Sequence, residues 1–501
     1  MATTRRTKPP RASKRTRAII AWVTVLVIIA VYAWLRAPGI IAIGSDNDEY
    51  QLVANALMGG DAPIVAGVEG TKYPLGYPAL LALIMLARIP LYAGTAALNL
   101  LALVAAAALT AGIAVRTPGK TAPAFTAGLA TAALIVTSRT VWQDMFSTMP
   151  EILLLAVIAG VLAAVNMPDS TKRTVVLTVL CVVAVLLKTL ALPLILGGFG
   201  IIWLFQRHLR VLIPPIVATA TALAGMLWMR RYPSHTTGYV ETFLLNDPDD
   251  AALGSITATG VIERTIRQIP DALRDIGYAI GPPTTSRIVA IIIAIVTLAI
   301  GVWGAKQLGR NRQLGQFALG AVAAYTVAMA LWPYNSPRFG MPLLPIAALG
   351  AGWLIRTVAT KLKRPAVTVT LVTAIVIGLV GTSITGVRDD GESQRQLFPA
   401  QHAARDAVVD WIETHAPTAK LVSFDYREIA NRTDGTVHPI GYTSDPAALR
   451  AQLDDADLLI VMRFYGKRTR QAQILLDTYP GIFTEVFSVN RGTVYAINHA
   501  S

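Results

Sequence analysis

Long apolar runs separated by short polar connections dominate the first 385 residues of the chain. About 20 apolar residues, within a range of about 17 to 25, cross a bilayer as a helix. Eleven runs are interpreted as such spans, and they lie near 18–36, 92–115, 121–137, 150–166, 174–190, 192–206, 211–229, 287–305, 314–332, 340–356 and 366–384. The pattern therefore predicts an all-α polytopic membrane domain of about eleven transmembrane helices over 18–385.

Two polar stretches between these runs are long, and both are expected on the outer side. They cover residues 37–91 and 230–286. Within the first, the apolar segment 76–90 is short and bounded by prolines, so we expect a helix at the membrane edge rather than a further span. Within the second, Val261 to Ile280 carries isoleucine and leucine at helical spacing between charged residues. This spacing predicts a helix lying on the membrane surface.

From about residue 386 the pattern changes to that of a small α/β domain. Segments typical of strands alternate with segments typical of helices, and a hairpin is expected to turn at Asn490–Gly492. The expected strands are 420–425, 457–464 and the hairpin 484–497, and the expected helices are 402–415, 445–456 and 469–480. Such alternation indicates one packed α/β layer over 386–501.

Composition and charge support a membrane protein and suggest its orientation. Apolar residues make up 54% of the chain and charged residues only 15%, against about 25% in soluble proteins. The net charge is +14, but Lys and Arg gather in short connections rather than on one domain, which argues for topology and against a nucleic-acid partner. Seven of them lie in the tail 1–17, which we expect in the cytoplasm. An odd number of spans then leaves the domain 386–501 outside.

Three acids just after the first span form the richest candidate site. Asp46, Asp48 and Glu49 lie within four positions, where they are interpreted as a base, a metal clamp or a cation gate. The alternative is a solvated loop that caps the helix beginning near Tyr50. From spacing alone both interpretations stay open.

Three cations are candidate phosphate partners on the same side. Lys72 precedes the short apolar helix, Lys188 lies near the outer end of its span, and Arg338 lies in an outer turn. Lysine and arginine can neutralise a phosphate. The alternatives are an interfacial Lys/Tyr belt for Lys72, snorkelling for Lys188 and a headgroup contact for Arg338.

Asp144 and Glu151 are the remaining acidic candidates, at the outer entry to the span 150–166. Glu151 follows Pro150 at the start of that helix, and its alternative role is to complement the helix dipole. The alternative interpretation of Asp144 is that it is an exposed loop residue. All these polar features lie at the outer edge, whereas channels and secondary transporters usually need polar groups near the midplane. An enzyme is therefore favoured over a flippase or transporter, and a non-catalytic assembly factor is a third alternative.

In their order along the chain, four segments resemble the GT-C fold glycosyltransferases that use polyprenyl-phosphate sugars. These enzymes include the protein O-mannosyltransferases and the lipid A aminoarabinose transferases. The segments are Asp46 to Tyr50 with ANALMGGD, then KYPLGYPALLALIML, then Met149-Pro150-Glu151, and finally RFGMPLLP from Arg338 to Pro345. The chain departs from the family pattern at Gly76, in place of a second proline, and at Phe339, where tyrosine is usual.

The resemblance implies an inverting membrane glycosyltransferase that moves a sugar from a polyprenyl-phosphate donor to a cell-envelope acceptor. Asp46 is the implied base, with Asp48 or Glu49 as substitutes, and Lys72, Lys188 and Arg338 would hold the donor phosphate. The candidate substrate-binding residues are Tyr50, Tyr73, Tyr77, Asp144 and Glu151. The acceptor would be a polysaccharide, a glycolipid or a protein, and the site would lie at the outer face of a bacterial plasma membrane among its lipids. A divalent metal is possible but unnecessary beside a cationic phosphate site.

The predicted topology can be tested with reporter fusions. A reporter fused after residue 389 should report an extracytoplasmic location, because an odd number of spans separates it from the basic tail. A cytoplasmic signal would mean that 76–90 crosses the membrane or that another helix is miscounted.

Overall fold

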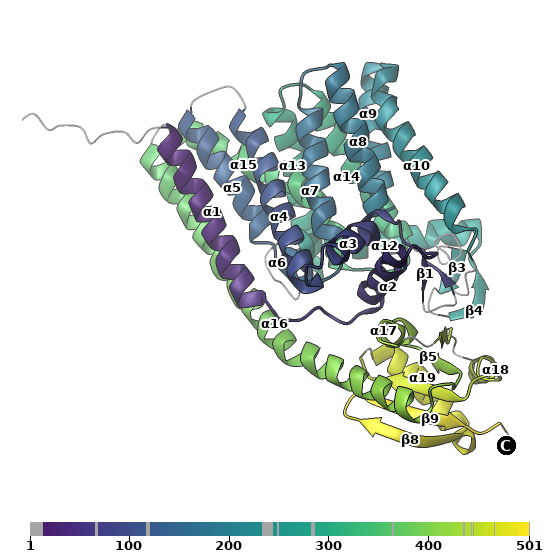
Figure 1. Cartoon of the computed structure of the whole chain (residues 1–501). Coiled ribbons are helices and arrows are strands. Elements are labelled where there is room, and N and C mark those ends of the chain that lie inside the picture. The colour runs from purple at the N-terminus through teal and green to yellow at the C-terminus, as the bar shows by residue number, and fades with distance from the viewer. Residues whose placement is uncertain are drawn as a thin grey trace, which may run out of the picture.

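A bundle of long helices makes up most of the chain, and a small α/β domain is attached at one end (Figure 1). The computed structural model describes residues 14–65, 69–116, 121–232, 244–247, 250–281, 286–362, 365–433, 436–441, 443, 445–464 and 466–499. Most of the predicted basic tail 1–17 and part of the second long polar stretch lie outside these residues. The α/β domain lies at the end of the bundle where helix α2 (Ser45–Gly59) is found, and its helix α17 (Tyr426–Ala430) contacts α2.

A helix occupies the position of every predicted span. These helices are α1 (Lys14–Arg36), α4 (Leu91–Arg116), α5 (Thr121–Val136), α7 (Glu151–Val165), α8 (Thr171–Leu187), α9 (Ala191–Gln206), α10 (Ile213–Met229), α13 (Arg287–Leu308), α14 (Gln313–Leu331), α15 (Leu344–Leu362) and α16 (Pro365–His415). Short 3₁₀ helices precede two of them, namely η1 (Leu209–Leu212) before α10 and η2 (Pro337–Leu343) before α15.

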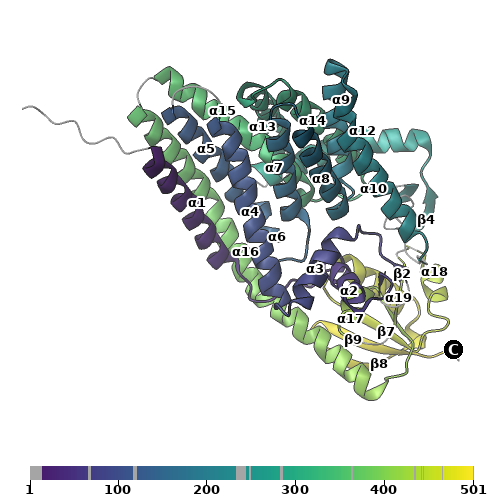
Figure 2. The same ribbon diagram turned by 45° about the horizontal axis from the view of Figure 1, so that its top comes forward.

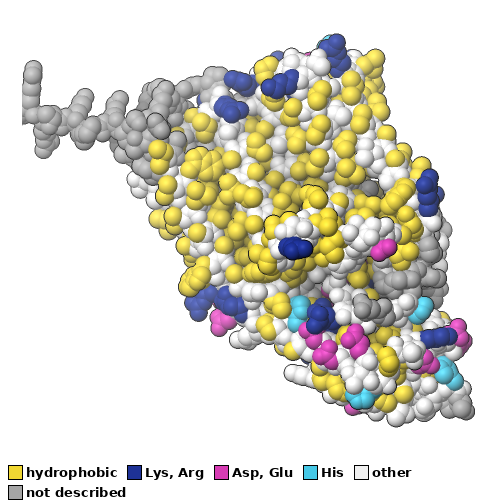
Figure 3. Space-filling model, in the orientation of Figure 1, with side chains coloured by type: hydrophobic (Ala, Val, Ile, Leu, Met, Phe, Trp, Pro, Cys, Tyr) yellow, Lys and Arg dark blue, Asp and Glu magenta, His cyan; other side chains and the backbone are white. Residues whose placement is uncertain are grey.

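The surface of this bundle is that of a membrane domain. Within the described residues, six helical segments are long and apolar enough to cross a bilayer, and five shorter helices are also apolar. Figure 3 shows hydrophobic side chains spread over the middle of the bundle, with Lys and Arg at its upper end and charges of both signs on the lower domain. The helices thus bear out a polytopic membrane fold, while the number of eleven crossings stays a prediction.

Helices outside the predicted spans gather at the end of the bundle that faces the α/β domain. They are α2 (Ser45–Gly59), α3 (Gly76–Leu86), α6 (Arg139–Asp144) and α12 (Ala258–Ile280). The helix α3 matches the short helix expected over 76–90. The helix α12 begins three residues before the expected Val261, because the Thr257 hydroxyl accepts a hydrogen bond from the Gly260 N–H and caps it. Ile262 and Ile266 of α12 are exposed, whereas Ile276 is buried.

The α/β domain contains one five-stranded sheet with the order β6-β5-β7-β9-β8. Its strands are β5 (Leu421–Ser423), β6 (Val437–Pro439), β7 (Leu458–Met462), β8 (Phe483–Val489) and β9 (Gly492–Ile497), and its helices are α17 (Tyr426–Ala430), α18 (Pro446–Ala451) and α19 (Gly466–Thr478). The first three strands are parallel, and β9 and β8 form the predicted antiparallel hairpin. Two small ladders, β1 (Ile64–Val65) with β2 (Glu69–Gly70) and β3 (Leu245–Asp247) with β4 (Asp250–Ser255), lie near the bundle.

The helix α16 joins the bundle to the domain without a break. The span expected over 366–384 and the helix expected over 402–415 are two ends of this one helix, which crosses the expected domain boundary near residue 386. The helix lies beside α1 in both ribbon views (Figures 1 and 2). Arg139 of α6 donates two hydrogen bonds to Asp390, of 2.8 and 2.7 Å, which holds α16 where it leaves the bundle.

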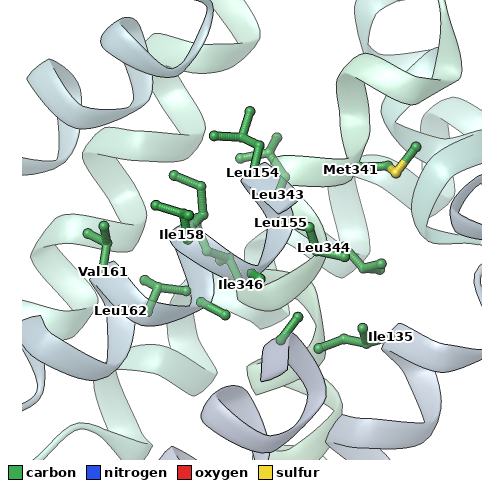
Figure 4. Packing of buried hydrophobic residues seen from close by; sticks show 14 of the residues in the cluster. Ile135, Leu154, Leu155, Ile158, Val161, Leu162, Met341, Leu343, Leu344 and Ile346 are labelled. Atoms are coloured by element: carbon green, nitrogen blue, oxygen red, sulfur yellow. The ribbon is translucent and has the colours of Figure 1, made fainter. Parts of the chain in front are cut away.

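Close packing of α7 against the start of α15 forms the centre of the bundle. Figure 4 shows Leu154 and Ile158 of α7 packed beside Leu343, Leu344 and Ile346. Inside a bilayer, van der Waals contact rather than exclusion of water favours such packing. The core therefore holds η2 in place, and the Tyr325 hydroxyl adds a 2.8 Å hydrogen bond to the Phe339 carbonyl.

Two glycines let α9 and α14 approach each other closely. A Cβ added to Gly320 would lie only 2.0 Å from the Gly197 carbonyl oxygen, so neither position tolerates a side chain without movement of a helix. Small residues at helix interfaces are typical of membrane bundles. The two helices form part of the wall of the cavity described next.

Candidate active site

A cavity of about 590 Å³ lies where the bundle, α2 and the α/β domain meet. One side is apolar and comes from α9, α10, α14 and the adjoining turns: Leu190, Pro193, Met226, Ala328, Leu331 and Trp332. The other side is cationic and consists of Lys72, Lys188, Arg338, Arg427 and Arg468. Among the described residues that line the cavity, Asp46 is the one acid. The cavity therefore suits an amphiphile whose head is an anion.

Asp46 and Arg338 form the central ion pair of the cavity. Arg338 Nη2 donates to Asp46 Oδ2 at 2.5 Å, and the Tyr73 hydroxyl donates to Asp46 Oδ1 at 2.7 Å. The three residues come from α2, η2 and the segment before α3, which lie far apart in the sequence. The Thr148 hydroxyl also donates to the Asn47 carbonyl at 3.1 Å, which fixes the start of α2 against the turn before α7.

The surroundings of Asp46 keep its carboxyl group ionised. Burial by itself would raise the pKa of Asp46, but the nearby charges of Arg338 and Lys72 and the hydrogen bond from Tyr73 lower it well below its usual value. The same neighbourhood raises the pKa of Arg338, because Asp46, Glu151 and Asp144 together outweigh its burial. The pair is therefore a carboxylate and a guanidinium at neutral pH.

A second ion pair supports the first. Lys188 follows the last residue of α8, and its Nζ contacts Glu151 Oε1 at the start of α7. Glu151 is only 1% exposed, and its Oε1 also lies 3.6 Å from Arg338 Nε. The Lys188 ammonium lies 4.7 Å from the centre of the Phe339 ring. A buried carboxylate at this depth would be costly without both cations.

The tyrosines form a stack beside Lys72. The rings of Tyr50 and Tyr73 stack at 4.7 Å, and Tyr77 packs edge-on against Tyr50 at 5.3 Å. Lys72 Nζ lies 5.4 Å from the Tyr73 ring centre and, like Tyr50 and Tyr73, lines the cavity. Tyr77 is fully buried behind the stack and supports it rather than lining the cavity.

Asp48 and Glu49 face the α/β domain instead of the cavity. Asp48 Oδ1 accepts a 2.7 Å hydrogen bond from Asn431, and Glu49 Oε2 lies 3.0 Å from Arg427 Nε. The Thr71 hydroxyl donates to Glu49 Oε1 at 2.8 Å. Asp48 points away from Asp46 around α2, whereas Glu49 lies only about 60° from Asp46, beside the edge where Arg427 enters. The structure therefore places two of the three candidate bases at a domain contact.

Burial changes the ionisation of Asp48, at this contact, and of Asp144, beside Glu151. It raises the pKa of Asp48 to about 7, and the charge of Glu428 adds to the effect. Asp144, at the end of α6, is half-buried rather than exposed and does not line the cavity. Its pKa is also raised to about 7 by burial and by the charge of Glu151. Asp144 thus interacts electrostatically with Arg338 and Glu151 without lining the cavity itself.

Two charged residues among those that line the cavity were missed by the sequence analysis. Arg427 of α17 and Arg468 of α19 line it from the α/β domain. Arg468 Nη1 donates to Asp425 Oδ1 and Glu428 Oε1, each at 2.7 Å. Neither arginine follows a local pattern typical of a binding site, and only the docking of the domain brings them to the cavity.

The acids in and beside the cavity, Asp46 and Glu151, are engaged by cations and hydrogen-bond donors. Across the described residues, no three His, Cys, Asp or Glu side chains come together as a cluster that could hold a metal ion. Both carboxylate oxygens of Asp46 already accept hydrogen bonds, from Tyr73 and Arg338. The charges of the site therefore suit an anionic ligand better than a divalent cation.

Comparison with known proteins identifies the fold. No protein-family model matches the sequence, and no curated protein sequence matches it either. The structure is similar to ArnT from Cupriavidus metallidurans, solved bound to undecaprenyl phosphate, with 14% identity, coverage of 96% of this chain and 98% of that chain, and a TM-score of 0.55. It is also similar to the Archaeoglobus fulgidus oligosaccharyltransferase in complex with Zn and sulfate, with 14% identity, coverage of 94% and 73%, and a TM-score of 0.50. The chain is a multi-pass membrane protein with the GT-C fold.

The contact between α2 and the α/β domain is expected to depend on Glu49. The substitution Glu49→Ala leaves the buried Arg427 without this counter-ion, and breaking such a pair costs about 3–5 kcal/mol. Hydrogen–deuterium exchange should therefore increase in α17, and the melting temperature in detergent should fall. Asp61→Ala, an exposed acid just after α2, is the control and should change neither quantity. Unchanged exchange in α17 after Glu49→Ala would contradict the proposed contact.

Proposed function

We propose that the protein is a membrane glycosyltransferase that moves a sugar from a polyprenyl-phosphate donor to an acceptor hydroxyl, with inversion and with Asp46 as the base. One observation carries the proposal: Asp46 shares a cavity with Lys72, Lys188 and Arg338, and that cavity has an apolar wall. A transporter would need a polar path through the bundle. The polar side chains that line this cavity gather instead around Asp46, at one end of the helices.

The two sides of the cavity support a lipid-linked donor. Leu190, Met226 and Leu331 belong to the membrane-facing half and offer apolar contacts to an isoprenoid chain. Lys188 and Arg338 border this half and carry the charges that a phosphate monoanion or dianion requires. The similar ArnT structure was solved with undecaprenyl phosphate, which belongs to the same class of lipid as the proposed donor.

The proposed reaction is one displacement at the anomeric carbon. The acceptor oxygen forms the new glycosidic bond while the bond between that carbon and the phosphate oxygen breaks. The acceptor proton passes to Asp46, and the electron pair of the broken bond leaves with the polyprenyl phosphate. Lys72, Lys188 and Arg338 stabilise the negative charge that grows on this phosphate. A base and a leaving group on opposite faces of the sugar give inversion.

The ion pair between Asp46 and Arg338 links donor binding to base strength. In the free protein the guanidinium lowers the pKa of Asp46 and so makes it a weak base. A donor phosphate that draws Arg338 toward itself neutralises part of this charge, and burial then raises the pKa of Asp46. Asp46 becomes an effective proton acceptor only once the leaving group is bound.

The acceptor is proposed to enter from the side of the α/β domain. Arg427 and Arg468 line this side of the cavity, and Tyr50 and Tyr73 offer ring faces to a sugar. With the basic tail in the cytoplasm, this end of the bundle would be extracytoplasmic, which suits a polysaccharide, a glycolipid or a secreted protein as acceptor.

Loss of the Asp46 carboxylate should abolish transfer. Asp46→Asn keeps the size of the side chain but cannot accept the proton, and a positioned base contributes about 10²–10⁴-fold to the rate. The measurement is transfer of radiolabelled sugar from polyprenyl-phosphate donors in membranes that contain equal amounts of each variant. Asp61→Asn serves as the matched control and should keep the wild-type rate. Equal rates for Asp46→Asn and wild type would rule out this mechanism.

The pH profile should reveal the link between Arg338 and Asp46. Transfer requires ionised Asp46, so the rate falls as the pH drops through the pKa of this group. Arg338→Gln removes the charge that holds this pKa down and leaves the effect of burial, so the acidic limb of the rate should move to higher pH. Lys188→Met also removes a phosphate partner, but Lys188 pairs with Glu151 and should leave the limb in place. Identical profiles for the two variants would contradict the link.

A further inference from the structure

A second cavity lies at the opposite end of the bundle from the candidate active site. It has a volume of about 390 Å³ and is formed where α8 begins and where α9 passes through η1 into α10. The helix α8 begins at this second cavity, and Lys188, just beyond the other end of α8, lines the candidate active site. The length of α8 therefore separates the two cavities by about 25 Å. We call it the distal pocket; its lining residues are Asp169, Arg173, Thr174, Leu177, Phe199, Arg207, His208, Leu209, Arg210, Val211 and Pro214.

The distal pocket carries an excess of positive charge. Arg173, Arg207 and Arg210 line it together with His208, against the single acid Asp169. Asp169 is 69% exposed, and its Oδ1 lies 3.8 Å from Arg173 Nη1, beyond hydrogen-bond distance. One solvated carboxylate therefore cannot balance three guanidinium groups.

Arg173 is the buried centre of this charge. Its side chain is only 6% exposed, and its Nε has no hydrogen-bond partner among the described residues. A buried guanidinium with an unpaired donor is costly unless an anion completes its contacts. Arg173 is the third residue of α8, and the positive end of the helix dipole favours an anion at the same place. The burial of Arg173, its unpaired nitrogen and the helix terminus all favour an anionic ligand.

Apolar residues beside the pocket favour a lipid as the source of this anion. Leu177, Phe199 and Val211 line the inner part of the pocket. Leu209 at the edge of the pocket is 75% exposed, and Ile213 and Ile216 next to it are 43% and 61% exposed, as expected for side chains that face acyl chains. An amphiphile can therefore place its phosphate between the arginines and its chains along α10.

We propose that the distal pocket binds the phosphate group of an anionic membrane phospholipid. The bound lipid would hold the start of α8 against η1 and α10 through Arg173 and Arg210. This site is separate from the candidate active site, and the proposal does not depend on the proposed glycosyl transfer. Inorganic phosphate offers the same chemistry without the acyl chains, so the test must distinguish the two.

Lipid binding to the full-length protein in detergent tests the proposal. Native mass spectrometry would be recorded during titration with phosphatidylglycerol, and in parallel with phosphatidylcholine as the zwitterionic lipid. Arg173→Gln and Arg210→Gln should each weaken phosphatidylglycerol binding about tenfold or more, as expected for loss of a charge-assisted hydrogen bond. Arg310→Gln is the matched control, because Arg310 is an exposed arginine of a short connection at the same end of the bundle. Differences between variants separate this site from any lipid bound in the active-site cavity.

Two further measurements keep the test decisive. Because Arg173 is buried, Thr174→Glu provides a variant that keeps Arg173 and adds a repelling charge to the pocket, and it should weaken binding as well. Millimolar inorganic phosphate should not displace phosphatidylglycerol if the acyl chains contribute. Full displacement by phosphate would assign the pocket to the free anion and overturn the lipid as its occupant. Equal phosphatidylglycerol binding in wild type and all three pocket variants, or an equal loss in Arg310→Gln, would overturn the site.

Discussion

The structure depends on the pairing of charged side chains that are buried near the membrane edge, where an unpaired charge would be costly. Asp46 and Arg338 are 292 residues apart, yet a 2.5 Å contact joins them. Glu151 and Lys188 form a second pair that touches the first. A charge at this depth is stable only beside its partner, so α2, α7, α8 and η2 must meet at one point. The packing of α7 against the start of α15 brings η2 to that point, and the cavity is the space these paired groups surround.

The α/β domain completes this arrangement. Glu49 and Asp48 of α2 bind Arg427 and Asn431 of the α/β domain, so the domain holds the helix that carries Asp46. The same contact brings Arg427 and Arg468 to the rim of the cavity. Because α16 runs unbroken from the bundle into the domain, the position of the domain is tied to the packing of α16 against α1 and α6.

Hydropathy and periodicity predicted the elements well, because both are local properties. Every expected span coincides with a helix, and four of the five strands of the domain overlap the expected segments. The edge strand β6 was not predicted. One helix, α16, crosses the change of composition near residue 386. The segment is polar but contains no strong helix breaker before Pro399, and Gly391 lies against the Leu35 backbone, where a larger residue would not fit. A change in polarity therefore marked the edge of the membrane domain and not the end of the helix.

The sequence by itself determined which residues must avoid the bilayer interior, and hence that Asp46, Lys72, Lys188 and Arg338 lie near one edge of the helices. That result needs only the cost of charge in hydrocarbon. Which of the three acids of α2 faces the cavity was decided by tertiary structure, since the direction of each side chain depends on how α2 is turned against the bundle and the domain. The same holds for Arg427 and Arg468, whose place in the cavity follows from contacts between segments hundreds of residues apart, which no local pattern encodes.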